Sequence, residues 1–180
     1  MSGQGSPENP ASVATRWAGG DFTLPQQESE GEVLLCQACT RLGRCRLGVE
    51  IEWRADDDRV ESELTCDVEH EGGPGVAHGG WTAGVLDELV GHVPLHLGQL
   101  AVTGRLDVKF VKPVPIERRL RATAHVVRRE GTRWYVHADL MLASSGALLA
   151  SADAIMVERD PAHFLRHHAW LEEQEAREAD

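Results

Sequence analysis

The sequence predicts an α+β domain in which one antiparallel sheet of five or six strands is wrapped around a central helix. Two segments with the pattern of strands come before one apolar helical segment, and four such segments come after it. The breaks between the later strands are short, and short connections keep successive strands adjacent. One long sheet wrapped over one helix buries the apolar faces of all these parts together.

The predicted strands alternate apolar and polar residues at period two, as half-buried strands do. Breaks at 112–117, 130–131 and 144–146 separate the later strands, and the last two of these are tight enough for hairpins. The predicted strands are residues 47–53, 59–66, 101–111, 119–130, 132–144 and 147–158.

The central helix is predicted to begin around Gly79–Trp81 and to run to Val93, stopping before Pro94, because proline ends most helices. Glycine and proline are concentrated at 71–75, just before it, so that stretch is expected to be a loop without regular structure. Apolar residues follow helical spacing at Trp81, Val85, Leu86, Leu89, Val90 and Val93, which indicates a largely buried helix.

Composition divides the chain into three parts. Residues 1–31 lack periodicity and are expected to form a disordered or loosely ordered tail. Residues 32–160 form the predicted domain, which opens with a short turn or helix followed by a loop over Glu32–Gly48. Residues 161–180 form an acidic, amphipathic tail, with a terminal helix expected at His163–Glu175.

The net charge of −11 disfavours nucleic acid or an anionic membrane as the main partner. The sequence contains no run of about eighteen apolar residues, so no membrane span is predicted. The N-terminal residues lack the basic and apolar regions of a secretory signal, so a cytoplasmic protein is expected. Lys112 and Arg118 belong to a basic middle region, which remains compatible with a small molecule that carries phosphate.

Four cysteines, Cys36, Cys39, Cys45 and Cys66, are expected to be thiols or metal ligands rather than disulfides in a cytosolic protein. The spacing Cys36-x-x-Cys39 is one from which zinc sites often start. The other two cysteines lack the matching spacing, so buried structural thiols are the favoured interpretation and no metal site is predicted.

Three motifs occur in order: His-Gly-Gly at 78–80 opening the helix, an acidic residue nine positions after His78, and a strand that ends as aromatic-x-x-Pro at 110–113. With them, residues 34–160 resemble the hotdog-fold thioesterases of the PaaI-like type, which are related to 4-hydroxybenzoyl-CoA thioesterase. The resemblance implies a hotdog fold, hydrolysis of an acyl-CoA thioester, and no cofactor.

The resemblance also implies roles for individual residues. Asp87 matches the catalytic carboxylate, which acts as general base toward water or as nucleophile. Gly79 matches the residue whose backbone N–H polarises the thioester carbonyl, and Thr103 matches a hydroxyl that helps hold the attacking water. His78 is expected to orient the helix start. Some relatives carry Asn or Gln six residues before this histidine, whereas here that position is Gly72.

Helix physics supports these roles independently. The first N–H groups of a helix lack intrahelical partners and carry the positive end of its dipole, and Gly79 and Gly80 let a carbonyl oxygen approach them closely. Each such donor stabilises a developing oxyanion by about 3 kcal/mol. Asp87 lies on an apolar helix, where it would need either a salt bridge, an exposed edge or a function. Glu88, the rival carboxylate, is about 100° away around the helix and is expected to be a structural partner.

Gly79 and Asp87 are eight residues apart, or about 12 Å along a helix, so both cannot touch one carbonyl group within the same chain. An antiparallel helix from a second copy would bring its own Asp87 beside Gly79. A homodimer, or a dimer of dimers, with two shared sites is therefore predicted.

The substrate and two alternatives to a thioesterase stay open. Trp81 is expected to shorten the acyl pocket and favour an aromatic or medium acyl group, and Lys112 or Arg118 could meet the phosphates of coenzyme A. The first alternative is a hotdog protein that binds acyl-CoA without catalysis, and the second is a metal-binding or interaction protein that uses the cysteine segment. A hydratase built on Asp87 and His92 is disfavoured, because the loop of those enzymes is absent.

Overall fold

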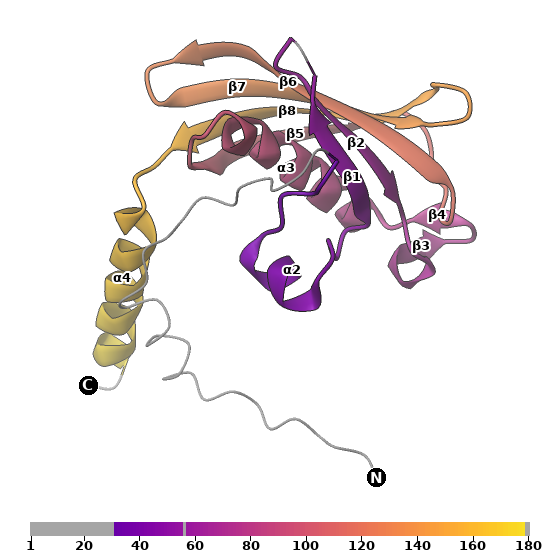
Figure 1. Ribbon diagram of the computed structural model, residues 1–180. Helices are drawn as coiled ribbons and strands as arrows, with labels where there is room; N and C mark the ends of the chain where they lie inside the picture. Colours follow the sequence, from indigo (N-terminus) through magenta and orange to yellow (C-terminus); the bar gives the residue numbers. More distant parts are fainter. Residues whose placement is uncertain (1–30, 56, 179–180) are drawn as a thin grey trace. The chain divides into compact units, whose positions relative to one another are not determined.

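The computed structural model describes residues 31–55 and 57–178, and in them a six-stranded sheet packs against the helix α3 (Figure 1). The tail predicted for residues 1–31 lies outside the described residues apart from Gly31. The elements are α2 (Gln37–Leu42), β1 (Val49–Arg54), β2 (Val60–Thr65), η1 (Val68–His70), β3 (Glu71–Gly73), β4 (Val76–Ala77), α3 (Gly79–His96), β5 (Ala101–Phe110), β6 (Arg119–Glu130), β7 (Arg133–Leu142), β8 (Leu148–Glu158) and α4 (Ala162–Glu178).

The large sheet has the strand order β1-β2-β6-β7-β8-β5, and each neighbouring pair is antiparallel. Tight turns join β6 to β7 through Gly131 and β7 to β8 through Gly146, both in the left-handed region with φ of 56° and 67°. The six strands predicted from residue alternation are confirmed. β1 and β5 form the two edges of the sheet.

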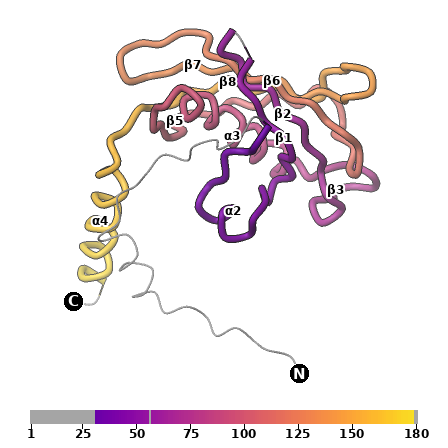
Figure 2. The backbone as a smooth tube through the Cα atoms, viewed as in Figure 1, coloured from indigo at the N-terminus to yellow at the C-terminus, as the bar shows by residue number. Residues whose placement is uncertain are grey.

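The sheet curves over α3, which lies along its inner face (Figures 1 and 2). Val85, Leu86 and Val90 of the helix have no exposed surface, and burial of each such side chain contributes about 2 kcal/mol. The strands that share this core contribute small side chains, which let the helix pack close to the sheet. These are Ala122, Ala124, Ala138, Ala150, Ala152 and Ala154.

Helix α3 continues to His96, so the expected end before Pro94 is wrong. A proline in the last turn removes a single backbone donor, and its fixed φ is already helical. The N–H of Leu97 donates to the carbonyl oxygens of Val93 and Pro94, and this closes the helix beyond the proline. The side chain of His96 also bonds a buried carboxylate described below, which anchors this last turn.

The stretch 71–75 was expected to be irregular, but it contributes to a small hairpin of β3 and β4. Pro74 and Gly75 lie between the two strands, and Gly75 adopts a φ of 75°. The N–H of Ala77 donates to the carbonyl of Val114 at 2.8 Å, which secures the hairpin just ahead of α3. The prediction of a loop is therefore wrong over the strand residues and correct only for the turn.

Residues 160–178 form a unit separate from the sheet and are described alone. The terminal helix predicted at His163–Glu175 is confirmed as α4, and its Arg166 pairs with Asp160 at 3.2 Å. Among the described residues, no helix is both long and apolar enough to cross a membrane.

Candidate active site

The start of α3 is capped by His78. Its backbone is extended, with φ −60° and ψ 139°, and its Nδ1 accepts a hydrogen bond from the N–H of Gly80 at 2.9 Å. The backbone N–H of His78 donates to the carbonyl of His70 at 2.7 Å. The histidine therefore fixes where the helix begins and ties it to the preceding turn.

The cap leaves the N–H of Gly79 open. Across residues 31–55 and 57–178 this N–H has no hydrogen-bond acceptor, whereas the N–H of Gly80 is occupied by His78 and that of Thr82 by the His78 carbonyl. An unpaired N–H at the positive end of a helix is a ready donor for a ligand oxygen. Of the two glycines, Gly79 presents the free donor and Gly80 does not.

A cavity of about 300 Å³ lies beside this free N–H. Phe110, at the end of β5, is 58% exposed, and its ring would lie 3.7 Å from a Cβ placed on Gly79. Lys112 lines the same cavity, together with Val76, Thr82 and Val114. The predicted carbonyl-binding residue and one predicted cation are thus brought together.

Arg118 lies elsewhere on the surface. It does not line the cavity beside Gly79, and its guanidinium donates to the backbone carbonyl of Glu117 at 3.0 Å. Lys112 therefore lines this cavity, and Arg118 does not.

Asp87 is half-buried on α3, and its Oδ1 accepts a hydrogen bond from the Thr103 hydroxyl on β5 at 2.8 Å. Within the described residues Asp87 forms no ion pair, so the salt-bridge interpretation is not supported there. The structure brings these two predicted residues together, although sixteen positions separate them.

Glu88 faces a different neighbour. Its Oε1 lies 3.4 Å from Nε2 of His92, one turn further along the helix, and the His92 side chain is only 4% exposed. This pairing agrees with the expected structural role of Glu88.

Gly72, where some relatives carry an amide side chain, passes very close to the helix cap. A Cβ at this position would lie 2.6 Å from Cα of His78 and 3.1 Å from its backbone nitrogen. Contacts this short with a backbone cannot be relieved by a side-chain rotation. Asn or Gln therefore does not fit here without a shift of the hairpin.

Trp81 is 5% exposed, and its ring lies 6.2 Å from that of His70. Its indole N–H is buried and, within the part of the chain that the structure describes, it has no partner. Trp81 does not line the cavity beside Gly79. Its predicted influence on the acyl group stays a prediction.

A family model described as the thioesterase superfamily matches residues 74–148, a span that contains the capped helix start, Asp87 and Thr103. The chain has the hotdog fold, and these residues resemble the thioesterase superfamily. Its fold class, an antiparallel sheet wrapped around one helix, is also that of the solved structures below.

Among characterised proteins, the hotdog chain is similar to the acyl-coenzyme A thioesterase THEM4 of Mus musculus, with 26% identity over 142 residues. That alignment covers 78% of this chain and 61% of the mouse protein. THEM4 of Rattus norvegicus is 23% identical over 118 residues, which cover 63% of this chain and 51% of the rat protein. The chain thus spans roughly half to three fifths of the length of these relatives.

Three solved structures share the hotdog fold. AziG of S. sahachiroi has a TM-score of 0.56 at 23% identity, covering 62% of this chain and 91% of AziG. PaaI of E. coli has a TM-score of 0.54 at 17% identity, covering 58% and 75%. A hypothetical thioesterase of Streptococcus pneumoniae TIGR4, solved with coenzyme A, has a TM-score of 0.53 at 21% identity, covering 56% and 80%.

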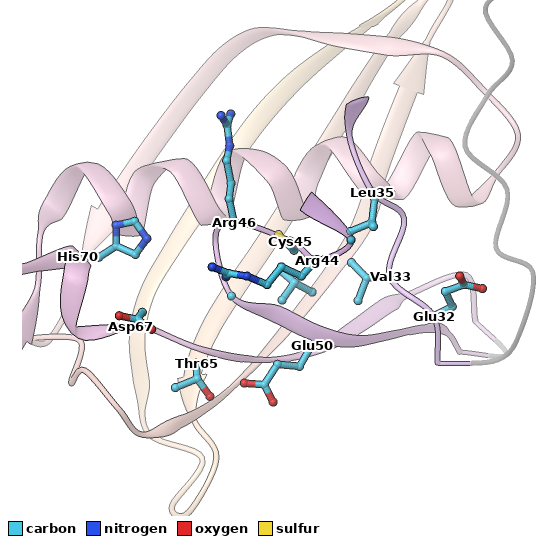
Figure 3. Close-up of a pocket in the computed structure, with 13 residues that line it drawn as sticks. Glu32, Val33, Leu35, Arg44, Cys45, Arg46, Glu50, Thr65, Asp67 and His70 are labelled. Carbon is cyan, nitrogen blue, oxygen red and sulfur yellow. The ribbon is translucent and has the colours of Figure 1, made fainter. Parts of the chain in front are cut away.

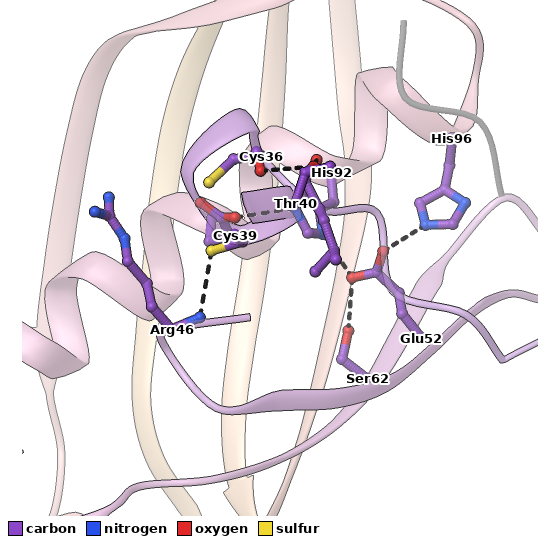
Figure 4. Close-up of polar contacts among 10 residues, drawn as sticks. Cys36, Cys39, Thr40, Arg46, Glu52, Ser62, His92 and His96 are labelled. Atoms are coloured by element: carbon purple, nitrogen blue, oxygen red, sulfur yellow. Dashed lines mark hydrogen bonds and ion pairs between the residues drawn. The ribbon is translucent and has the colours of Figure 1, made fainter. Parts of the chain in front are cut away.

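The hotdog domain also contains a buried charged cluster that sequence reasoning missed (Figure 4). Glu52 on β1 has no exposed surface and accepts hydrogen bonds from His92 Nδ1 and His96 Nε2, both at 2.7 Å. Ser62 on β2 donates to the same carboxylate at 3.2 Å. The cluster joins the end of α3 to the edge of the sheet, far along the helix from Gly79.

The cluster has strongly shifted pKa values. Burial alone would raise the pKa of Glu52, but hydrogen bonds and charge from His92 and His96 overcome it and lower that pKa to about 2. Burial would likewise lower the pKa of His92, but its bonds to Glu52 and Glu88 raise that pKa to about 10. The cluster is therefore an ion pair near neutral pH.

Replacing Glu52 with Gln is expected to lower the free energy of unfolding by about 3 kcal/mol near pH 5.5, because it removes the nearer and fully buried carboxylate of the two that contact His92. The Glu52 contribution is present above about pH 4.5 and is lost as pH falls toward 2. The His92 contribution is present below about pH 6.5 and is lost as pH rises toward 10. Stability is therefore expected to be greatest between these limits, as measured by urea unfolding at pH 3, 5.5 and 8.5.

The control is Glu63→Gln, which removes an exposed ion pair with Arg119 and is expected to change stability by less than about 0.5 kcal/mol. If Glu52→Gln unfolds with the same free energy and the same pH dependence as the unmodified protein, the cluster is not the stabilising pair described.

The four cysteines are free thiols, and three of them are buried. Burial raises the pKa of Cys39 and of Cys66 to about 11 each, so these two are weak nucleophiles at neutral pH. Sγ of Cys39 accepts the N–H of Arg46 at 3.3 Å. Within the described residues, no group of three or more potential ligands is arranged to hold a metal ion.

A second cavity of about 560 Å³ lies between the segment around α2 and the strands β1 and β2 (Figure 3). Val33, Leu35 and Val49 supply apolar lining, and charges of both signs surround them, including Arg44 and Glu50. None of the predicted site residues lines it.

Proposed function

We propose that this protein hydrolyses an acyl-CoA thioester to the free acid and coenzyme A. The observation that carries the proposal is a pair of features on one helix: an unpaired N–H at Gly79 and a carboxylate, Asp87, held by Thr103 without any ion pair among the described residues. The N–H can donate a hydrogen bond to an oxyanion, and the carboxylate can accept a proton from water. The name of THEM4 and the coenzyme A bound to the pneumococcal protein support this substrate class.

In the proposed reaction the thioester carbonyl oxygen accepts a hydrogen bond from the Gly79 N–H. Asp87 takes a proton from water as the water oxygen attacks the carbonyl carbon, and the carbonyl electron pair moves onto the oxygen at the helix start. When the carbon–sulfur bond breaks, sulfur leaves with its electron pair and receives the proton from Asp87. The products are the acid and the thiol of coenzyme A.

The site is proposed to be shared between two copies of the chain. Because α3 is continuous from Gly79 to His96, Gly79 and Asp87 are about 12 Å apart within one copy. β5 ends the strand order, and an edge strand of ten residues can pair with a second copy of itself. Such two-fold pairing would run the two α3 helices antiparallel, with Asp87 of each near Gly79 of the other. A further pairing of dimers is compatible with this arrangement.

A detail of the pneumococcal protein supports the roles of Asp87 and Thr103. Two of its solved structures carry an Asp-to-Ala and a Thr-to-Ala mutation at positions sixteen residues apart. The same separation lies between Asp87 and Thr103, which are hydrogen-bonded here.

Lys112 is proposed to meet the phosphates of coenzyme A, because it lines the cavity beside the Gly79 N–H. Arg118 does not line this cavity, and a contact between it and coenzyme A stays a prediction. Because Lys112 is exposed, its contribution to the affinity for coenzyme A is expected to weaken as the salt concentration rises.

A panel of acyl-CoA substrates, followed with a thiol-reactive dye, tests the proposal directly. Release of coenzyme A is expected, with kcat/KM greatest for an aromatic or medium acyl group, because the bulky Trp81 follows Gly79 by two residues on α3. A preference for long saturated chains contradicts the role of Trp81. No release from any member of the panel contradicts hydrolysis itself.

The second candidate function is binding of acyl-CoA without turnover, and Gly72 favours it, because this position supplies no side-chain donor for the carbonyl. Calorimetric titration with a non-hydrolysable acyl-CoA thioether separates the two. Binding without hydrolysis of the matching thioester supports the second candidate, and binding with hydrolysis supports the first.

A further inference from the structure

Strand β5 contains a β-bulge next to the proposed site. In its pairing with β8, Thr103 lies opposite Met156 and Arg105 lies opposite Ile155, so Gly104 is an extra residue without a partner. On either side of the bulge the ladder is regular.

The bulge changes which face of the sheet Thr103 occupies. Leu106 lies opposite the buried Ala154 and therefore points toward α3, because directly opposed residues share a face. In an unbroken strand every second residue from Leu106 would also point inward, which includes Gly104 and excludes Thr103. With the bulge, Thr103 lies opposite the buried Met156, and its hydroxyl reaches both Asp87 at 2.8 Å and Met156 Sδ at 3.7 Å.

The space around Gly104 is tight. A Cβ there would lie 2.9 Å from Cγ2 of Val157 and 3.2 Å from the carbonyl oxygen of Ile155. The first of these contacts is closer than side chains tolerate, and the second involves backbone that cannot rotate away. A larger residue therefore requires the Val157 side chain or the strand beside Thr103 to shift.

We propose that Gly104 is a positioning residue, whose bulge turns the Thr103 hydroxyl inward so that it holds the Asp87 carboxylate in its working orientation. The kinetic part of this inference rests on the proposed function, while the geometric part does not. Gly104 itself touches no substrate; it acts through Thr103.

The test compares four variants: Thr103→Ala, Gly104→Ala, the two combined, and Gly104→Ala with Val157→Ala. Thr103→Ala is expected to lower kcat about tenfold with little change in KM, as loss of one hydrogen bond to a charged group does. Gly104→Ala is expected to lower kcat by a similar factor and to have no further effect when Thr103 is already Ala. Removing the Val157 methyl groups is expected to restore much of the loss.

A purely structural role for Gly104 predicts a different pattern. Thr103→Ala and Gly104→Ala would then each lower kcat by a factor of its own, and the two factors would multiply in the variant that carries both. Gly91→Ala is the stability control, because a Cβ there has room, 3.9 Å from the nearest Met156 atom. If Gly104→Ala keeps full kcat while Thr103→Ala loses it, the inference is overturned.

A crystal structure of Gly104→Ala, or of the combined variant with Val157→Ala if the single variant does not fold, gives a readout that needs no activity. A Thr103–Asp87 separation beyond hydrogen-bonding distance in Gly104→Ala supports the inference. An unchanged 2.8 Å contact in that variant overturns it. For Gly104→Ala with Val157→Ala, a restored Thr103–Asp87 hydrogen bond is the supporting result. If that hydrogen bond stays broken, the clash with Val157 is not the cause. Absence of acyl-CoA hydrolysis in the unmodified protein would instead refute the proposed function and leave this geometric test intact.

Discussion

Replacing Asp87 with Asn is expected to lower kcat for acyl-CoA hydrolysis about a thousandfold while the fold is kept. An amide has nearly the same shape as the carboxylate and can still accept the Thr103 hydroxyl, but it cannot take a proton from water. Because no ion pair is lost among the described residues, little stability should be lost with it. Steady-state kinetics and a thermal unfolding curve measure both effects.

The matched control is Asp153→Asn, since the Asp153 side chain is 80% exposed and bonds only His137 among the described residues. Its kcat should stay within about twofold of the unmodified protein. Equal losses in the two variants, or an Asp87→Asn enzyme that turns over at the normal rate, would contradict the role of Asp87 as the base.

Replacing Gly79 with Pro is the second large change, with an expected loss of about a hundredfold in kcat. Proline is favoured at the first position of a helix, and the extended backbone of His78 suits the residue before a proline. The substitution therefore removes the proposed carbonyl donor and leaves the helix in place. Circular dichroism checks the helix, and kinetics with the best substrate of the panel measures the loss.

Gly79→Ala serves as the comparison, because it keeps the N–H and its Cβ makes only an ordinary contact of 3.7 Å with Phe110. It should lose much less activity than Gly79→Pro. Equal losses would point to crowding of the cavity rather than to the missing donor.

Mixing the two inactive proteins tests the shared site. In a dimer of Asp87→Asn with Gly79→Pro, one of the two sites combines an unmodified Gly79 with an unmodified Asp87. Random exchange of subunits makes about half of the dimers mixed, so about a quarter of normal activity should return. A site contained within one chain predicts no recovery at all.

Much of this fold could be predicted from sequence because its signals are local. Alternation identified the six strands, and the spacing of Val85, Leu86 and Leu89 identified the helix, since tight turns and a single core leave few other arrangements. Asp87 and Gly79 came from the motif around the helix start. What could not be predicted is how far α3 runs past Pro94, because a buried contact of His96 holds that turn.

Two bulges account for the larger omissions. In β1 the register shifts between Val49 and Ile51, so Glu52 turns inward with no exposed surface, while Ile51 is 40% exposed. Strict alternation predicts the reverse. The bulge in β5 likewise turns Thr103 toward Asp87. A sequence signal did exist for the first: His92 falls on the apolar predicted helix, where a buried polar side chain needs a hydrogen-bond partner.

The close approach of Gly72 to His78 restricts how this protein could be improved. A single-codon change that introduced an amide at Gly72 would push on the backbone of His78 before the new side chain reached the carbonyl. Selection for faster turnover, in nature or in the laboratory, should therefore alter the hairpin around residues 71–77 first, or recruit a donor from another position.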